Sequence, residues 1–473
     1  MRDPRWRTLG LLVAFAAAAL APVPWLIPAI AVAGVVAVAL RRAGPAIGRS
    51  EHGGGHDGLI LGSDPRGHQV SVSERELSAH GLILGASGTG KSTTLLGILD
   101  QLIARGRPVV VIDMKGSPTF ASSLAASAHA AGRPFAVWTP DGPGRWNPLQ
   151  HGNPTELKDK LMATERFTEP HYQRAAERFV QTVLQVLASR DPSPPTLSAV
   201  VELMDPHRLR GSLRHVSPEL RERVQDYLGG LTPDQLSAVR GLQTRLAILT
   251  ESHIGRYLEP GDGPPVDLRA ALAGQQVVLF SLNSSTYGRL AGQLGTLAVQ
   301  DLVCAAGHRL SEQAVGGPSE QGYVVIDEAS VLSGDHVLAL FARGRESGLG
   351  VLAATQELAD LDRAAPGLRD QVLGNTAIKL AHRQDVPSSA HTIAQLAGTE
   401  KAWEETQRLG GPLLGGMRAG GGTRRQTEQF IVHPNQVKTL RTGEAVLISK
   451  LRAARPETIR VRPPVERGGP ELG

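Results

Sequence analysis

The sequence predicts an α/β protein in which one largely parallel sheet is interrupted by an all-helical insertion. Strand-length apolar runs recur in two segments, 58–153 and 263–450. Several of these runs are unbroken strings such as VVVID at 109–113, which is typical of parallel strands that are covered on both faces. Between them, residues 154–262 place apolar residues at helical spacing, as in HYQRAAERFVQTVLQVLAS, with no strand-like run.

The N-terminal segment predicts a membrane anchor. Residues 10–40 carry no charge, and a straight helix of that length would span about 46 Å, more than the roughly 30 Å of a hydrocarbon core. Three prolines between residues 22 and 28 break it, and arginines flank it on both sides. We therefore expect a hairpin of two short transmembrane helices in 1–42, both flanks being cytoplasmic, and a glycine-rich linker in 43–57. The alternatives are a cleaved signal peptide and a single tilted or kinked span.

Composition sets weaker limits. A formal charge of +5 permits a polyanionic partner without demonstrating one, whereas 41% hydrophobic and 20% charged residues indicate a folded protein. The single cysteine, Cys304, cannot form an internal disulfide, so the folded bulk is expected in the cytosol. Proline and glycine make 451–473 a predicted flexible tail. We expect Trp138, Trp403 and Tyr323 to be core residues rather than base-stacking platforms.

A glycine-broken loop predicts a nucleotide site. Residues 80–93 read HGLILGASGTGKST, which is a strand, a G-x-x-x-x-G-K-[ST] loop and the start of a helix. Backbone N–H groups of such a loop converge on phosphates, Lys91 reaches the β and γ phosphates, and Ser92 can hold Mg²⁺. The predicted nucleotide-binding residues are Gly85, Ala86, Ser87, Gly88, Thr89, Gly90, Lys91, Ser92 and Thr93.

An acidic pair predicts hydrolysis of the bound nucleotide. The segment GYVVIDEAS places Asp327 at the end of an apolar strand, with Glu328 next to it. Asp327 can orient the magnesium shell, and Glu328 can polarise the water that attacks the γ phosphate. ATP and Mg²⁺ are therefore the expected substrate and metal.

Three further sites are candidates from their positions. Gln356 ends the run GLGVLAATQ, where a side-chain amide would sense the γ phosphate. Arg345 is a candidate arginine finger across a subunit interface, with Arg343 as its competitor. Asp113 and Lys115 follow another apolar run, and the sequence leaves open whether they serve the site or form a simple turn.

These segments, in this order, resemble the TraG/TraD-type coupling ATPases of bacterial conjugation and type IV secretion, within the FtsK and HerA superfamily. The similarity extends from about residue 55 to residue 450. Its pieces are the phosphate loop, VVVIDMKG, WNPLQ before the helical insertion, VVIDEAS, GRESGLGVLAATQ, LGNTAIKLAHR and FIVHPNQVKTLRTGEAVLI.

The resemblance implies a RecA-like P-loop NTPase fold and an ATP-driven DNA motor. It assigns Lys91, Ser92, Asp327 and Glu328 to ATP and Mg²⁺, Gln356 to γ-phosphate sensing and Arg345 to a finger in trans. It further implies a homohexameric ring that moves single-stranded DNA together with its relaxase. The ring would be held in the inner membrane by a multi-pass anchor and would dock to a secretion channel. The alternatives are an FtsK-type double-stranded DNA translocase and a nucleotide-switched protein-secretion component.

Overall fold

The computed structural model describes residues 58–164, 167, 169–317, 320–332, 334–407, 422–452 and 455–465. The predicted membrane hairpin and its linker lie outside these residues. Among the helices of the described part, none combines the length and the apolar character needed to cross a membrane.

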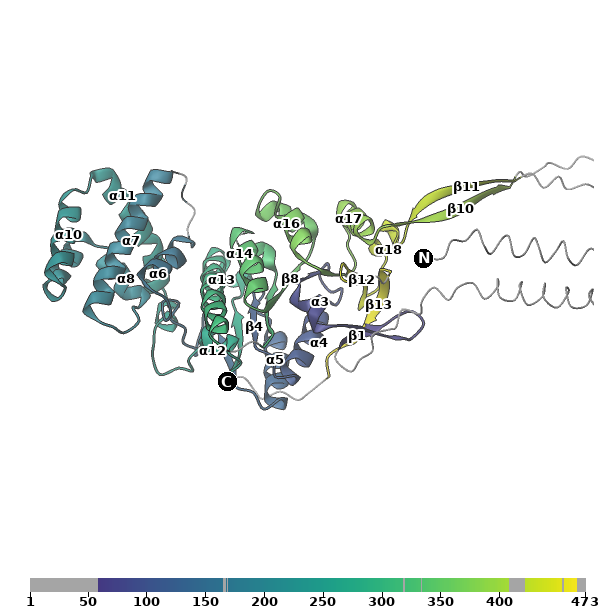
Figure 1. Ribbon diagram of the computed structural model, residues 1–473, viewed down its shortest axis with the longest axis horizontal. Helices are drawn as coiled ribbons and strands as arrows, with labels where there is room; N and C mark the ends of the chain where they lie inside the picture. Colours follow the sequence, from purple (N-terminus) through teal and green to yellow (C-terminus); the bar gives the residue numbers. More distant parts are fainter. Residues whose placement is uncertain are drawn as a thin grey trace, which may run out of the picture. The chain divides into compact units, whose positions relative to one another are not determined.

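An eleven-stranded sheet organises the described chain, and seven of its strands are parallel neighbours (Figure 1). All seven coincide with apolar runs that the sequence marks as strands. In sheet order they are β9 (Ile378–Ala381), β3 (Gly81–Leu84), β8 (Leu349–Thr355), β7 (Gly322–Asp327), β4 (Val109–Asp113), β6 (Val277–Ser281) and β5 (Phe135–Trp138). Since they are parallel, their carboxyl ends meet at one edge of the sheet, where binding sites of α/β folds form.

Four antiparallel strands extend the sheet beyond β9. They are β12 (Glu444–Ser449), β13 (Glu457–Val461), β1 (Leu59–Ser63) and β2 (Gln69–Val72). The position of β13 differs from expectation, because it falls in the segment 451–473 that was predicted to be a flexible tail. Its Ile459 and Val461 are buried while Arg460 between them is exposed, so this short strand is held by its pairing with β12 and β1.

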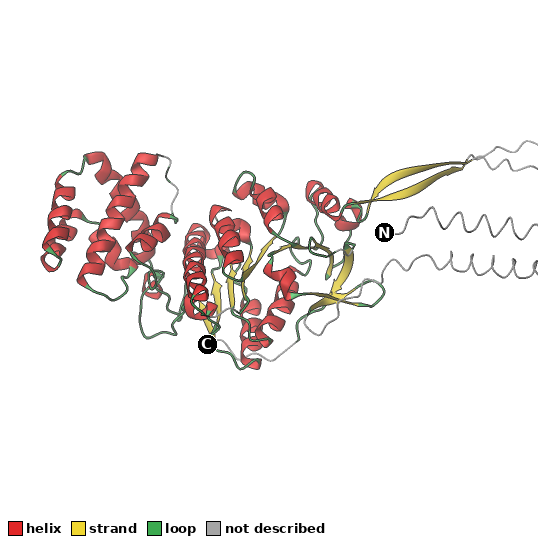
Figure 2. Cartoon of the chain, viewed as in Figure 1, coloured by secondary structure: helices red, strands yellow, loops and turns green. Residues whose placement is uncertain are grey.

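Helices cover both faces of the sheet (Figure 2). In β4, Val109 and Val111 pack into one core with α4 (Lys91–Ala104) and α5 (Pro118–Ala130), whereas Val110 and Ile112 pack into the other with α13 (Ser284–Ala314) and α14 (Gly334–Glu346). This alternation explains the unbroken apolar strings of the sequence. The remaining helices are short: α3 (Glu74–Ser78), α12 (Leu268–Leu272), η3 (Ala329–Val331), α15 (Leu358–Ala364), α16 (Leu368–Asn375), α17 (Pro387–Ala397) and α18 (Pro434–Lys438).

The insertion is helical in every element described between residues 154 and 258, and Figure 1 shows its helices gathered in one group. Capping side chains start most of them; Thr232 and Gln235, for example, form a capping box, and a proline follows at the first helical position. The elements are α6 (Pro154–Met162), α7 (Pro170–Arg190), α8 (Leu197–Leu203), α9 (Pro206–Ser212), η1 (Leu213–His215), α10 (Pro218–Gly229), α11 (Pro233–Glu251) and η2 (Gly255–Leu258).

A buried ion pair joins the insertion to the sheet domain. Lys160 of α6 has a side chain with 0% exposure, and its Nζ lies 2.6 Å from Oδ1 of Asp301 in α13. The same amino group donates to the carbonyls of Pro148 and His151, and Trp146 donates from Nε1 to Oδ2 of Asp301 at 3.0 Å. Both charges are thus paired and hydrogen-bonded, as burial requires.

Side chains of α4 hold β1. Gln101 accepts from the N–H of Ile60 at 2.8 Å and donates to its carbonyl at 2.9 Å, so that it continues the ladder of β1. Arg105, which follows α4, donates to the carbonyl of Gly58 at 2.7 Å. The helix that begins at the phosphate loop is therefore bonded directly to the first described strand.

A two-stranded hairpin, β10 (Thr399–Gln407) and β11 (Gly422–Phe430), stands outside the main sheet. Trp403 on β10 is 55% exposed, with the guanidinium of Arg424 stacked 4.6 Å from the centre of its ring. The expectation that Trp403 is a core residue is therefore wrong, because it lies largely exposed on a two-stranded sheet that is separate from the eleven-stranded one. Trp138 and Tyr323 are fully buried, as expected.

Candidate nucleotide site

The phosphate loop connects β3 to α4 and requires glycine at several positions. Gly88 and Gly90 adopt positive φ values of 76° and 111°, which favour glycine. A Cβ on Gly85 would lie 2.6 Å from Oγ1 of Thr89, so close packing excludes a side chain there. Gly90 is the N-cap of α4 and supplies no side-chain bond, which leaves the first N–H groups of the helix available for phosphates.

The start of α4 carries the remaining predicted loop residues. Lys91, Ser92 and Thr93 are the first three residues of the helix. Thr94 follows, and its hydroxyl lies 2.9 Å from Nε2 of His382. Burial lowers the pKa of His382 to about 4, so the ring is neutral: Nδ1–H donates to the carbonyl of Glu444 and Nε2 accepts from Thr94. This contact fixes the first turn of α4 against the residue that follows β9.

The acidic pair lies at the same edge of the sheet. β8 separates β3 from β7, and Asp327 ends β7 opposite Asp113 of β4. Glu328 follows in a left-handed conformation with φ of 63°, which is uncommon for a non-glycine residue and clusters at functional sites. Both side chains are enclosed, since Asp327 is 2% exposed and Glu328 is 8% exposed.

Two lysines bridge the two carboxylates. Nζ of Lys91 lies 3.3 Å from Oε2 of Glu328 and 3.7 Å from Oδ1 of Asp327. Nζ of Lys115 lies 3.4 Å from the same Oε2 and 3.6 Å from Oδ2 of Asp327. Two lysines and two carboxylates therefore form one cluster, in which Lys115 is 36% exposed and the other three side chains are at most 10% exposed.

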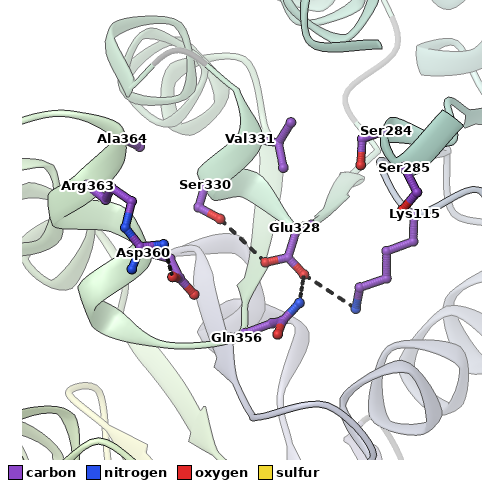
Figure 3. A pocket seen from close by; sticks show the side chains of 10 residues that line it. All are labelled: Lys115, Ser284, Ser285, Glu328, Ser330, Val331, Gln356, Asp360, Arg363 and Ala364. Atoms are coloured by element: carbon purple, nitrogen blue, oxygen red, sulfur yellow. Dashed lines mark hydrogen bonds and ion pairs between the residues drawn. The ribbon is translucent and has the colours of Figure 1, made fainter. Parts of the chain in front are cut away.

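Gln356 completes the surroundings of Glu328 (Figure 3). It follows β8, and its Nε2 donates to Oε2 of Glu328 at 3.1 Å, while the hydroxyl of Ser330 lies 3.4 Å from Oε1. These groups face a cavity of about 600 Å³. Its lining is Lys115, Ser284, Ser285, Glu328, Ser330, Val331, Gln356, Asp360, Arg363 and Ala364.

The charges of the cluster control one another. Burial lowers the pKa of Lys91, and the carboxylates of Asp327 and Glu328 oppose this only in part. Burial also lowers the pKa of Lys115, but the same carboxylates outweigh it, so the pKa lies above its ordinary value. Burial raises the pKa of Glu328, yet Lys91, Gln356 and Lys115 together bring it below its ordinary value. Glu328 is thus a carboxylate at neutral pH and can accept a proton.

The site fits Mg²⁺ and a triphosphate. Oδ1 of Asp327 is buried and accepts no hydrogen bond among the described residues; the ammonium of Lys91, 3.7 Å away, is too far to donate one, so this oxygen has room for a closer ligand. Ser92 occupies the loop position from which a hydroxyl reaches the metal. A Ser hydroxyl and an Asp carboxylate are the hard oxygen ligands that Mg²⁺ takes beside phosphates.

Arg345 lies away from this edge of the same chain. It is exposed near the end of α14, four positions before β8 begins, whereas Gln356 follows β8. The seven residues of β8 span about 23 Å at a rise of about 3.3 Å each. Its charge instead acts on His80, whose pKa burial lowers to about 4 and which bonds Phe341 of α14 and Val351 of β8. Arg343 is also exposed and forms a loose pair with Glu346 at 3.8 Å.

The structure therefore gathers most of the predicted site and adds to it. Lys91, Asp327, Glu328 and Gln356 meet, and Lys115, which the sequence left open, joins them. Sequence reasoning missed His382 and Ser330; the only signal for His382 was its place directly after an apolar run, and Ser330 carried none.

Two family models match the segments that form the site. Residues 63–141 match the central domain of the helicase HerA, and this range contains the phosphate loop and Lys115. Residues 322–442 match the TraM recognition site of TraD and TraG, and this range contains Asp327, Glu328, Arg345 and Gln356. A comparison with curated proteins finds no match.

Solved structures share the fold at low sequence identity. The unbound conjugative coupling protein TrwBdeltaN70 superposes with a TM-score of 0.64 at 14% identity, covering 88% of this chain and 90% of that chain. TrwB in complex with a non-hydrolysable ATP analogue gives 0.60 at 15% identity, covering 85% and 90%. VirB4 of Thermoanaerobacter pseudethanolicus gives 0.52 at 15% identity, covering 86% and 96%.

Both family matches fall on the residues that converge around Glu328, and the fold that carries them is that of a conjugative coupling protein. The chain accordingly resembles TraG/TraD-type coupling ATPases over the segments that form its site, and it shares the fold of the coupling protein TrwB.

Proposed function

We propose that this ATPase converts hydrolysis of the γ phosphate into translocation of DNA. The observation that carries the hydrolysis is the environment of Glu328, a buried carboxylate beside the phosphate loop that receives bonds from Lys91 and Gln356. A nucleotide-binding switch without turnover does not need such a group, whereas a hydrolase needs a base next to the attacking water.

The chemistry follows from the positions of these groups. The loop 85–93 binds the phosphates through its N–H groups, and Lys91 neutralises charge on the β and γ phosphates. Glu328 accepts a proton from the attacking water as the new bond to the γ phosphorus forms. The bond between that phosphorus and the bridging oxygen breaks, and ADP carries the bridging oxygen away. When bound by Ser92 and Asp327, Mg²⁺ supplies positive charge to the β and γ phosphate oxygens.

Gln356 and Arg345 connect this chemistry to the rest of an assembly. Gln356 ends β8 next to Glu328, so loss of the γ phosphate changes the contacts of its amide. Arg345 is exposed and about a strand length from its own site, which suits contact with the nucleotide of a neighbouring subunit. This placement supports a homohexameric ring in which each finger completes the next site.

We also propose a cargo and a membrane attachment for the ring. TrwB, whose fold this chain shares, is described as a conjugative and plasmid coupling protein, and we propose single-stranded DNA with its relaxase as the cargo here. The uncharged residues 10–40 would anchor the ring in the inner membrane beside a type IV secretion channel, with the ATPase domain in the cytoplasm. The insertion carries 14 basic and 15 acidic residues, so we assign the grip on DNA phosphates to the ring and not to the insertion as a whole.

The hydrolysis is tested with Glu328→Gln in the full-length protein. This variant keeps the shape of the side chain and removes the proton acceptor, so kcat should fall at least about a hundredfold while ATP still binds. Lys91→Ala should instead weaken ATP binding itself. Turnover by Glu328→Gln at the wild-type rate would overturn the assignment of Glu328.

Translocation is tested by turnover with and without DNA. We expect single-stranded DNA to stimulate kcat more than double-stranded DNA of the same length, and the stimulation to weaken at high salt because phosphate contacts carry the binding. Equal rates without DNA and with either form would refute the motor function and leave the ATPase. Stronger stimulation by double-stranded DNA would point to an FtsK-type translocase.

A further inference from the structure

Lys115 occupies a position that the two family resemblances leave without a role. β4 and β7 run in parallel with Asp113 opposite Asp327, so the residues that follow the two strands lie side by side. Lys115 comes two positions after Asp113, and Glu328 one position after Asp327. The register of two neighbouring strands therefore delivers this lysine to the acidic pair.

The loop around Lys115 is fixed through its backbone. Asp113 accepts from the N–H groups of Lys115 and Ser117 at 2.9 and 2.8 Å, and the carbonyl of Met114 accepts from the N–H of Ser284 at 2.7 Å. Gly116 has φ of 68°, and a Cβ there would lie 2.6 Å from Cβ of Asn283. None of these bonds uses the side chain of Lys115. The loop aims the side chain without depending on it.

The side chain points from this loop into the cavity (Figure 3), and it is 36% exposed there. A lysine in a simple surface turn would extend into solvent, because desolvating an ammonium group is costly. Lys115 instead lies within 3.6 Å of both carboxylates and lines the same cavity as Gln356. Its amino group therefore lies on the cavity wall that a γ phosphate bound next to Glu328 and Gln356 would face.

Three donors compete for one carboxylate oxygen of Glu328. Oε2 of Glu328 is approached by Lys91 at 3.3 Å, Lys115 at 3.4 Å and Gln356 at 3.1 Å. An oxygen that is shared among three donors is poorly placed to accept a proton from water. Lys91 belongs to the phosphate loop and has the β and γ phosphates as its partners. Lys115 has no such assignment, so the terminal phosphate is the one anion of the reaction that it can take in exchange.

We propose that Lys115 is a second phosphate-facing cation of the site, which contacts the terminal phosphate of a nucleoside triphosphate and thereby leaves Glu328 free to accept the proton of the attacking water. This inference rests on the proposed hydrolysis. In the reaction Lys115 adds positive charge beside the transferred γ phosphoryl group, over whose equatorial oxygens the charge of the transition state is spread, and it keeps its own proton. A diphosphate lacks the group that Lys115 contacts.

The test is the preference for triphosphate over diphosphate, measured as the ratio of the Kd values for ADP and a slowly hydrolysed ATP analogue, both with Mg²⁺, on the full-length protein. In Lys115→Met the preference should fall at least about tenfold, the effect of losing one charge-assisted contact. In Lys115→Arg, which keeps the charge, it should stay within about threefold of wild type. Lys438→Met, on the exposed face of α18, is the matched control and should leave it unchanged.

A second arm separates phosphate contact from an effect through Glu328. In a Glu328→Gln background, Lys115→Met should cause the same loss of triphosphate preference, because the phosphate contact does not need the carboxylate. If the loss vanishes in that background, Lys115 acts only through Glu328 and the proposal is overturned. An unchanged preference in the single variant overturns it too.

Turnover and melting temperature are measured on the same variants. We expect kcat of Lys115→Met to fall at least about tenfold. The variant should fold because the loop bonds are made by the backbone, but its melting temperature should fall because Asp327 and Glu328 lose one of the two lysines that pair with them. If this variant does not fold, Lys115→Gln takes its place in both binding arms. A wild-type protein that binds nucleotide without turnover would refute the proposed hydrolysis, whereas the binding ratios would still decide the role of Lys115.

Discussion

The buried pair between Lys160 and Asp301 makes the joint of the helical insertion testable. Lys160→Met removes the cation and two further bonds to carbonyls, and it leaves the carboxylate of Asp301, which is 7% exposed, with only Trp146 as a donor among the contacts described above. Breaking one partner of a buried pair costs about 3–5 kcal/mol, because the other charge stays buried without compensation. We expect a loss of this size in the free energy of unfolding.

The double variant Lys160→Met, Asp301→Leu shows whether pairing is the cause. Replacing both charges by apolar groups of similar volume is often neutral, so the double variant should lie within about 1 kcal/mol of wild type. The two single losses should then exceed the double loss by at least about 3 kcal/mol. Arg208→Met removes the exposed pair with Glu202, whose side chains are 63% and 57% exposed, and should cost less than about 1 kcal/mol.

Urea unfolding followed by tryptophan fluorescence and circular dichroism measures these losses, and Trp146 reports directly because it is buried and bonded to Asp301. If Lys160→Met unfolds at the wild-type urea midpoint, the reasoning about the uncompensated carboxylate fails. A double variant that loses the sum of the two single losses would refute the coupling.

Three further predictions concern single positions. Burial and the charge of Lys450 lower the pKa of Lys379 to about 7 from 10.5, so between these pH values the unfolded chain binds more protons than the folded one. The difference in unfolding free energy between wild type and Lys379→Met should therefore rise with pH. Urea titrations should show a rise of about 2 kcal/mol between pH 7 and 9. Gly116→Ala should lower the free energy of unfolding by more than Gly132→Ala does. Gly132 has a similar φ of 64° but nothing within 4 Å of a Cβ, so its replacement should cost only about 1 kcal/mol. Equal losses for the two variants would rule out crowding at Gly116. Arg345→Ala should lower kcat by about a thousandfold without changing nucleotide affinity, whereas Arg343→Ala retains turnover, and a wild-type rate for Arg345→Ala would exclude it as the finger.

The sequence was sufficient for the parts of the fold whose pattern is local. The seven parallel strands are buried on both faces, so each reads as an apolar string, and the glycines of the phosphate loop are required by backbone geometry that no other residue replaces. Glu328 was equally readable, because it follows such a string directly. These features depend on neighbours in the chain, which a single sequence displays.

Features that depend on distant pairing were less readable. β10 reads TEKAWEETQ and has no apolar face, so its strand character comes from its partner β11 alone. β13 is a short strand whose place is decided by β12 and β1. Lys115 was ambiguous for the same reason, since its approach to Glu328 arises from the register of β4 with β7, two strands far apart in the chain.

The bonds between α4 and the first described strand have a mechanical consequence. Gln101 and Arg105 clamp the backbone at Ile60 and Gly58, and the other end of the same helix is Lys91. A force on the backbone at Gly58 would therefore be transmitted along α4, a helix of about 20 Å, to the phosphate loop.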